Sequence, residues 1–207
     1  MILSFDLFGT LVTVERPADP AAAVARELRE RGVGVPDDWA VAYGERHVDA
    51  PPEAEVPLPA HVAAALRSRD ASFAPETVRR AVVAAFDPAV ETRPGAVAAV
   101  AAARERGPVG ILTNCSVPEL PRRTLIRSAL DRDAFDAVVT SAACGWRKPH
   151  ARAFEAVADR LGGECDALVH VGDDPETDGG VADVGGRFVS VATVPLPSLP
   201  DWLEGRS

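Results

Sequence analysis

The chain has 207 residues, of which 47% are hydrophobic and 26% charged, and its formal net charge is −9. This length suits one compact domain or one domain with a modest insertion, and the composition is ordinary for a globular protein. The acidic balance argues against nucleic acid and anionic membranes as partners, and no apolar run approaches the roughly 18 residues that span a bilayer.

The first half of the chain is predicted to be one strand followed by helices. Its start lacks the basic and long apolar regions of a signal peptide, so we expect a cytoplasmic protein. Ile2–Phe5 is an apolar strand that ends at Asp6. Residues 15–93 are predicted as four helices without a clear strand, because apolar residues recur there at helical spacing. These helices could form a small separate bundle.

From Pro94 onward the pattern alternates between helix and strand. Helices are predicted over residues 95–106, 118–130 and 152–161, and short strands over 109–112, 137–139, 167–171 and 188–191. A turn with a short helix follows near 178–185, and the Pro-rich tail after Thr193 is predicted to be irregular. This alternation predicts an α/β fold, with a mostly parallel, Rossmann-like sheet flanked by helices.

In such sheets the ligand binds at the carboxyl ends of the strands, so the residues just after each strand are the candidate site. The sequence places Asp6, Thr113, Lys148 and the Gly172-Asp173-Asp174 run at these positions. A carboxylate can attack phosphorus, Mg²⁺ prefers oxygen ligands, and a hydroxyl with an ammonium can hold phosphate oxygens. Lys148 is the single lysine of an arginine-rich chain, which indicates a position that needs a compact charge.

Four segments resemble, in the right order, the motifs of the haloacid dehalogenase (HAD) superfamily of hydrolases. FDLFGTL (5–11) resembles the first motif, LTN (112–114) the second, GWRKPHARAF (145–154) the third and HVGDDPETD (170–178) the fourth. One motif alone is a weak signal, but four in order at predicted strand ends are specific. The resemblance implies a Rossmann-like core of residues 1–14 and 94–207, with a small α-helical cap of residues 15–93 inserted after the first motif.

The resemblance also implies a role for each matching residue. Asp6 would be the nucleophile, and it would bind Mg²⁺ together with the backbone carbonyl of Phe8 and the carboxylate of Asp173. Thr113 and Lys148 would bind phosphate oxygens during catalysis. The expected partner is therefore a small, phosphorylated substrate, which the cap would select, and the protein would be a monomer or a homodimer.

Five further positions belong to the expected site. Asp174 or Asp178 would hold metal-bound water or orient the lysine, so both are counted with the metal site. Asn114 would line the site and, like Gly9, contact the substrate. Thr10, in the first motif, is grouped with the catalytic residues, as is Asn114.

One position departs from the pattern of the family's phosphatases. These usually carry a second aspartate, a general acid and base, two residues after the nucleophile, and here that residue is Phe8. Family dehalogenases have an aromatic residue there, because attack on carbon expels halide without protonation. They usually lack the acids of the fourth motif, whereas this chain keeps Asp173, Asp174 and Asp178, which are costly to place together without a cation. The sequence therefore favours a Mg²⁺-dependent phosphatase that forms an aspartyl phosphate on Asp6.

The missing acid leaves alternatives open. A positioned acid or base contributes about 10²–10⁴ in rate, so the enzyme should favour good leaving groups or take an acid from the cap, with His47, His61 and Glu45 as candidates. A metal-independent 2-haloacid dehalogenase is one alternative, and it would need an arginine such as Arg16 facing the substrate carboxylate. A protein that kept the fold and binds phosphate or metal without turnover is the other.

Overall fold

A five-stranded sheet forms the centre of the molecule. The computed structural model describes residues 1–87 and 89–205, so Pro88 of the expected cap and residues 206–207 of the expected core lie outside the described residues. The strand order is β5-β4-β1-β6-β7, and each neighbouring pair is parallel. The strands are β1 (Ile2–Phe5), β4 (Val109–Thr113), β5 (Ala137–Thr140), β6 (Leu168–Gly172) and β7 (Arg187–Ser190). The predicted α/β fold is confirmed.

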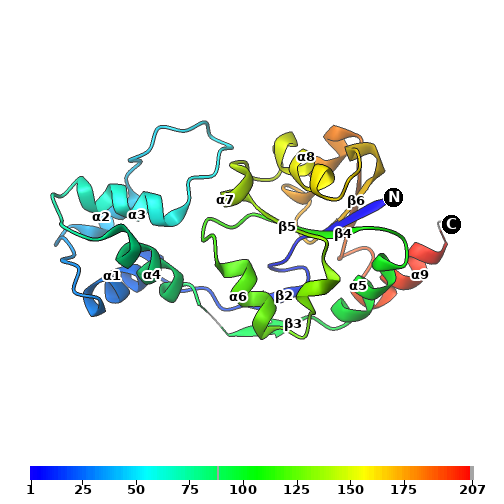
Figure 1. Cartoon of the computed structure of the whole chain (residues 1–207), viewed down its shortest axis with the longest axis horizontal. Coiled ribbons are helices and arrows are strands. Elements are labelled where there is room, and N and C mark those ends of the chain that lie inside the picture. Colours follow the sequence, from blue (N-terminus) through cyan, green and yellow to red (C-terminus); the bar gives the residue numbers. More distant parts are fainter. Residues whose placement is uncertain (88, 206–207) are drawn as a thin grey trace.

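Helices cover both faces of this sheet (Figure 1). The two faces are distinct because successive side chains of a strand point to opposite sides. Leu3 and Phe5 of β1 belong to the hydrophobic cluster on one side, and Ile2 belongs to the cluster on the other. The helices around the sheet are α5 (Ala96–Arg104), α6 (Leu120–Arg127), α7 (Ser141–Cys144), α8 (Ala151–Arg160) and α9 (Leu199–Glu204).

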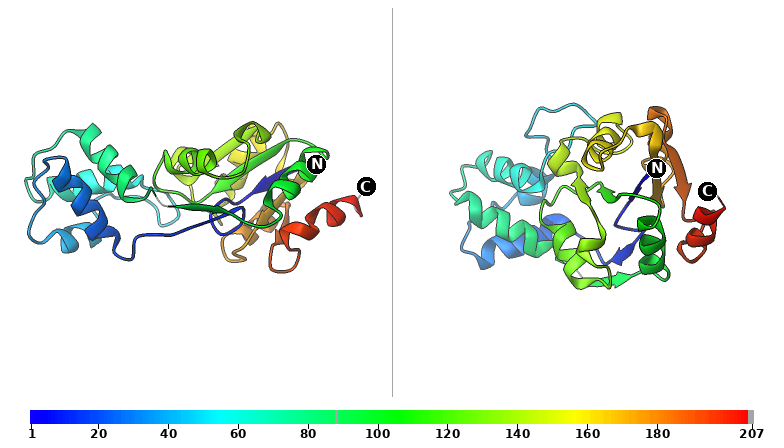
Figure 2. Two further views of the ribbon diagram at one scale, coloured as in Figure 1. Left: turned by 90° about the horizontal axis from the view of Figure 1, so that it is seen from below. Right: turned by 45° about the vertical axis from the view of Figure 1, so that its right-hand side comes forward.

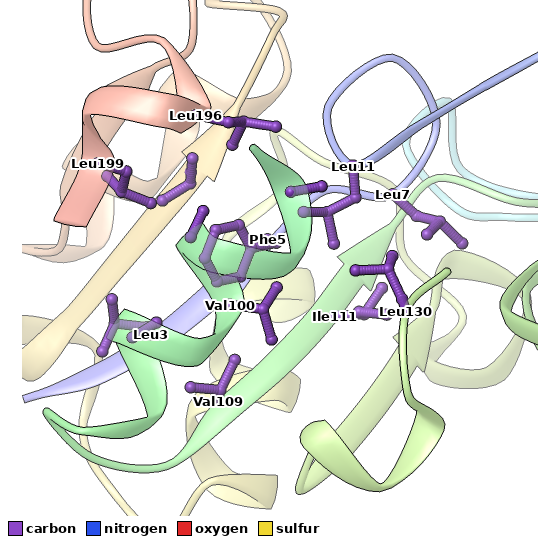
Figure 3. Packing of buried hydrophobic residues seen from close by; sticks show 14 of the residues in the cluster. Leu3, Phe5, Leu7, Leu11, Val100, Val109, Ile111, Leu130, Leu196 and Leu199 are labelled. Atoms are coloured by element: carbon purple, nitrogen blue, oxygen red, sulfur yellow. The ribbon is translucent and has the colours of Figure 1, made fainter. Parts of the chain in front are cut away.

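The core below α5 and α9 fixes the edge of the sheet at which β1 and β4 end. Figure 3 shows Phe5 of β1 packed among Val100 of α5, Ile111 of β4 and Leu199 of α9. Full burial of one such side chain contributes about 1.5–3 kcal/mol. Both strands are therefore held firmly up to their last residues, and the polar residues that follow them start from fixed positions.

Four helices pack together beside the sheet, as the left-hand view of Figure 2 shows. Asp19 caps the first of them, accepting a 2.9 Å hydrogen bond from the amide of Ala22. Their shared cluster of buried side chains also takes in Cys115, Val117 and Leu120, which follow β4. The helices are α1 (Pro20–Glu30), α2 (Trp39–Gly44), α3 (Leu58–Arg67) and α4 (Pro75–Ala85).

Two expectations about local structure are wrong. Residues 15–93 do contain a strand, because β3 (Val90–Thr92) pairs antiparallel with β2 (Val12–Val14). A strand of three residues is too short to show a periodic pattern, and its partner is distant in the sequence, so the sequence does not reveal the pairing. The tail after Thr193 is not irregular: Leu196–Ser198 is a 3₁₀ turn, and α9 follows with a proline in its first turn, where the missing N–H costs nothing. Further 3₁₀ turns cover Arg132–Ala134, Cys165–Ala167 and Asp178–Val184. No helix within the described ranges is both long and apolar enough to cross a membrane.

Candidate active site

A chain of buried polar groups runs beneath the carboxyl ends of β1 and β6. Nζ of Lys148 donates to Oδ1 of Asp6 at 2.8 Å and to Oδ1 of Asp178 at 2.5 Å. The same Asp178 oxygen lies 3.0 Å from Nε2 of His170, whose Nδ1 lies 2.7 Å from Oγ of Ser4. These five residues come from three distant parts of the sequence, and all are buried.

A cavity of about 280 Å³ opens above this chain. All ten predicted site residues except Gly9 and Thr10 line it, and Arg16 and Thr177 complete the wall. From the sequence, Arg16 is only one of several arginines that could face a substrate carboxylate, and Thr177 has no expected role. The parallel sheet thus brings the four motifs to one place.

Asn114 fixes the backbone of Lys148. Its amide Nδ2 donates to the carbonyl of Lys148 at 2.9 Å, and its Oδ1 accepts from the amide of Lys148 at 2.8 Å. Nζ of the lysine also donates to the carbonyl of Leu112 at 3.0 Å. Thr113, between Leu112 and Asn114, is buried and lines the cavity. The end of β4 therefore positions the lysine at both its backbone and its ammonium group.

The loop after Asp6 packs against Asp173 and donates a hydrogen bond to it. Oγ1 of Thr10 donates to Oδ1 of Asp173 at 2.8 Å, and the carbonyl of Gly9 accepts a hydrogen bond from Arg93. Gly9 has a φ of +99°, and a Cβ there would lie 2.5 Å from Oδ2 of Asp173. Only glycine lets the loop approach this carboxylate so closely. Gly9 and Thr10 therefore lie behind the site rather than on the wall of its cavity.

Asp174 and Asp178 differ in their surroundings. Oδ1 of Asp174 accepts from the amide of Glu176 and Oδ2 from Oγ1 of Thr177, so both oxygens stabilise the turn that begins at Asp174. Asp178 is 1% exposed, its Oδ1 accepts from Lys148, and its Oδ2 accepts from the amide of Asp174. A Cβ on Gly172 would lie 2.1 Å from Oδ2 of Asp178, so glycine is required there. Of the two expected roles, this geometry favours lysine orientation for Asp178.

Burial and charge together set the ionisation of the polar chain. Burial raises the pKa of Asp178, but the hydrogen bond from His170 and the charge of Lys148 outweigh it and hold that pKa below its ordinary value. Burial likewise lowers the pKa of Lys148, yet Asp6 and Asp178 reverse this and raise it. Burial raises the pKa of Asp6, with Lys148 opposing. The two neighbouring acids therefore favour the charged form of Lys148.

His170 is a neutral link in the same chain. Burial lowers its pKa, so the ring carries one proton. Because the Asp178 carboxylate can only accept, Nε2 donates to it, and Nδ1 accepts from the hydroxyl of Ser4. Phe154 packs edge-on against the ring at 5.5 Å between centroids. His170 is therefore a core residue with both ring nitrogens hydrogen-bonded, and it fixes Asp178, a function that the sequence did not indicate.

The oxygen groups of the cavity match the preferences of Mg²⁺. The four carboxylates on its wall outnumber the two cations, Lys148 and Arg16, so a phosphate dianion would be repelled unless a further cation were bound. In the described part of the chain, no group of three or more His, Cys, Asp or Glu side chains could hold a metal ion. Mg²⁺ sites of phosphoryl-transfer enzymes use one or two carboxylates completed by water and phosphate. Asp6 and Asp173 face the same cavity with Phe8 beside them and meet that smaller requirement.

The acids suggested as substitutes for the missing general acid lie elsewhere. Glu45, His47 and His61 line a separate cavity of about 330 Å³ that shares no residue with the one above Lys148. Nε2 of His47 is bonded to the carbonyl of Ala42 at 2.6 Å, and Nε2 of His61 to that of Tyr43 at 2.7 Å. The expectation that one of them serves the site therefore has no support in this geometry.

A loop between α2 and α3 docks on the segment that carries Lys148. The amide of Glu55 donates to the carbonyl of Gly145 at 2.9 Å, and the amide of Arg147 to the carbonyl of Glu53 at 3.0 Å. Oγ of Ser141 donates to Oε2 of Glu55 at 2.6 Å. The segment between α2 and α3 is thus hydrogen-bonded to the chain within one residue of Lys148.

Comparisons with known proteins agree with this fold. Solved structures of similar fold include CbbY from Rhodobacter sphaeroides in complex with phosphate (18% identity, 91% of this chain and 84% of that chain covered, TM-score 0.58). A HAD phosphatase from Thermococcus onnurineus is also similar (22% identity, 91% of this chain and 85% of that chain covered, TM-score 0.54). So is a dehalogenase solved with an intermediate complex (21% identity, 92% of this chain and 84% of that chain covered, TM-score 0.54). At these identities the likeness shows the fold alone, and a search of curated proteins found no match. The family model of the haloacid dehalogenase-like hydrolases matches residues 1–183, and the chain belongs to that family.

Proposed function

We propose that the protein is a Mg²⁺-dependent phosphatase that acts on a small phosphorylated substrate through Asp6. The observation that carries this proposal is the pairing of Lys148 with both Asp6 and Asp178 in a cavity that Asp173 also lines. A cation and a nucleophilic carboxylate held side by side suit attack on an anionic group. The acids of the fourth motif would have no such use in attack on a haloalkane.

The reaction would follow from these residues. One carboxylate oxygen of Asp6 forms a bond to phosphorus while the bond from phosphorus to the leaving-group oxygen breaks, and water then hydrolyses the aspartyl phosphate. Lys148 bonds only Oδ1 of Asp6, so Oδ2 remains for a second interaction. Lys148 and Thr113 hold phosphate oxygens, and Asp178 keeps the lysine in place. Mg²⁺, held by Asp6, Asp173 and the carbonyl of Phe8, would neutralise phosphate charge.

The leaving group would depart without help from a proton donor at the usual position. Phe8 lines the cavity where the family's phosphatases carry their second aspartate, and its ring has no proton to give. A general acid contributes about 10²–10⁴ in rate, mostly for leaving groups that are strong bases. We therefore propose that the substrate has a weakly basic leaving group. The helices α1–α4, within residues 15–93, would serve as the cap that selects it.

The direct test is hydrolysis of p-nitrophenyl phosphate, with Mg²⁺ and with EDTA, by the wild type and by Asp6→Asn. Asp183→Asn is the matched control, because Asp183 is exposed and lies outside the cavity. The proposal expects a Mg²⁺-dependent rate in the wild type and the control that is lost in Asp6→Asn. Equal rates in all three would overturn it and would favour a protein that binds without turnover.

A second function is favoured by one specific observation. Phe8 and Arg16 face the same cavity, and an aromatic residue with a nearby arginine would suit a 2-haloacid whose carboxylate pairs with the guanidinium. Halide release from 2-chloropropionate in EDTA, lost in Asp6→Asn, would establish this dehalogenase activity. Release that requires Mg²⁺, or no release, would exclude it.

A further inference from the structure

A second cavity of about 170 Å³ lies at the junction between the core and the helical insertion. Val117 and Leu120 come from the segment after β4, and Phe86 follows the last turn of α4. Phe8, Val14 and Pro17 also belong to its apolar wall. The cavity is therefore built by the core and the insertion together.

This cavity adjoins the one above Lys148 and shares three lining residues with it. Phe8, Arg16 and Asn114 line both, so a single molecule could occupy the two spaces at once. Arg16 is exposed, and it forms no salt bridge within residues 1–87 and 89–205. A guanidinium at the junction suits an anionic group held there. A molecule bound across both spaces would thus have its phosphate on the polar side and its remainder on the apolar side.

The apolar side has a definite chemistry and size. Its polar lining residues are Glu15, Arg16, Asn114 and Ser116, and of these Arg16 and Asn114 belong to the junction. A sugar or a polyol would leave its hydroxyl groups without enough partners among the apolar side chains, which is costly. A cavity of about 150 Å³ lined by Leu, Ile and Phe is known to hold benzene. The space here is therefore large enough for one aromatic ring.

We infer that this cavity is the leaving-group chamber of the enzyme, and that the substrate is a phosphate monoester of a phenol or a similarly compact aromatic alcohol. The inference rests on the proposed function and names its substrate class. Phe8 belongs both to the chamber and to the reacting site. Its ring forms part of the chamber wall, and it stands where a general acid is missing, which matters least for a phenolate leaving group.

The test measures binding of two phosphonates, because their carbon–phosphorus bond cannot be hydrolysed and turnover does not enter. Benzylphosphonate carries a phenyl ring one atom from phosphorus, as in phenyl phosphate, and methylphosphonate lacks the ring. Calorimetric titration of the wild type with Mg²⁺ present gives both dissociation constants. We expect benzylphosphonate to bind at least about tenfold more tightly, since even partial burial of a phenyl ring is worth that factor.

Two variants connect this preference to the chamber. Val117→Phe should fill the space, and Phe86→Ala should remove part of its wall, so each should reduce the tenfold ratio to about threefold or less. The matched controls are Val41→Phe, at a valine that is 60% exposed on α2, and Phe73→Ala, in the insertion but outside the chamber. Both controls should keep the ratio. Because two ligands are compared in the same protein, a general loss of affinity cancels.

The outcomes separate this inference from the proposed function. A ratio near one in a wild type that hydrolyses p-nitrophenyl phosphate would overturn the chamber alone. If both chamber variants kept a ratio of dissociation constants of ten or more, the chamber would also be overturned, because the ring would then bind elsewhere. A ratio that falls in Val117→Phe and Phe86→Ala and persists in the controls supports the chamber, whether or not hydrolysis is detected.

Discussion

Replacing Asp178 with asparagine tests how the site holds its lysine. Asp178 accepts three hydrogen bonds, from Lys148 and His170 on Oδ1 and from the amide of Asp174 on Oδ2. Asparagine has one acceptor oxygen and one donor amide. In either orientation its NH₂ group faces a donor, so at least one buried group loses its partner.

The expected loss of stability follows from this geometry. Removing one partner of a buried ion pair costs about 3–5 kcal/mol. Asp6 still neutralises Lys148 in the variant, so the lower end, about 3 kcal/mol, applies. At about 2–4 °C per kcal/mol for a protein of this size, the Tm should fall by about 6–12 °C. A lysine that has lost one of its three acceptors is positioned less accurately, which should also lower kcat/KM by about 100-fold.

Thermal unfolding followed by circular dichroism, in EDTA, measures the stability effect without any contribution from metal. Asp183→Asn is the matched control, since it makes the same change at an exposed position of the same 3₁₀ segment. A Tm of Asp178→Asn within about 2 °C of this control would refute the reasoning. A Tm that falls only when Mg²⁺ is present would instead identify Asp178 as a metal ligand.

Three further predictions follow from other contacts. Lys148→Arg should lower the free energy of unfolding by about 1–3 kcal/mol and kcat/KM by about 100-fold, because the longer, planar guanidinium overfills a buried site. A near-normal kcat/KM together with an unchanged midpoint of chemical denaturation would contradict this. Gly9→Ala should displace Asp173 and raise the Mg²⁺ concentration for half-maximal activity, and an unaltered Mg²⁺ titration would count against it. Hydrogen bonds from two arginines of α6, opposed by burial, hold the pKa of Asp87 at about 2, below the ordinary value of about 3.9. The contribution of ionised Asp87 to the free energy of unfolding is therefore present above pH ~4 and is lost as the pH falls toward 2. The difference in stability between the wild type and Asp87→Asn, measured by urea titration, should shrink over that pH range and stay constant at higher pH.

The sequence was sufficient to predict the parallel sheet because four of its five strands, all except the edge strand β7, are mostly apolar and buried. Such runs carry their own signal, and a polar residue at the end of each run locates the site. β3 could not be predicted in the same way, since Val90–Thr92 is a strand only because β2 lies beside it. The same holds for α9, because Pro200 and the two prolines that precede the helix indicate a loop until its packing on α5 is seen.

In the candidate site, too, some residues could be predicted from the sequence and others could not. Asp6, Lys148 and Asp173 could be proposed from residue type and position, because a reaction on phosphate needs those groups. The polar chain from Ser4 through His170 could not, since neither residue differs in the sequence from an ordinary core position. Hydrogen bonds between residues 166 positions apart depend on register, which the sequence does not display.

Phe8 connects the chemistry of the site with the identity of its substrate. An aspartate there would serve basic leaving groups, including sugar and polyol alcohols, and would place a charge beside Val117 and Leu120. A phenylalanine carries no charge and forms part of the apolar wall, so under our proposals one residue accounts for both the missing acid and the apolar chamber. Phe8→Asp should therefore act in opposite directions on two substrates. It should raise kcat/KM for glycerol 2-phosphate relative to phenyl phosphate, and a variant that slowed both equally would show that Phe8 only packs.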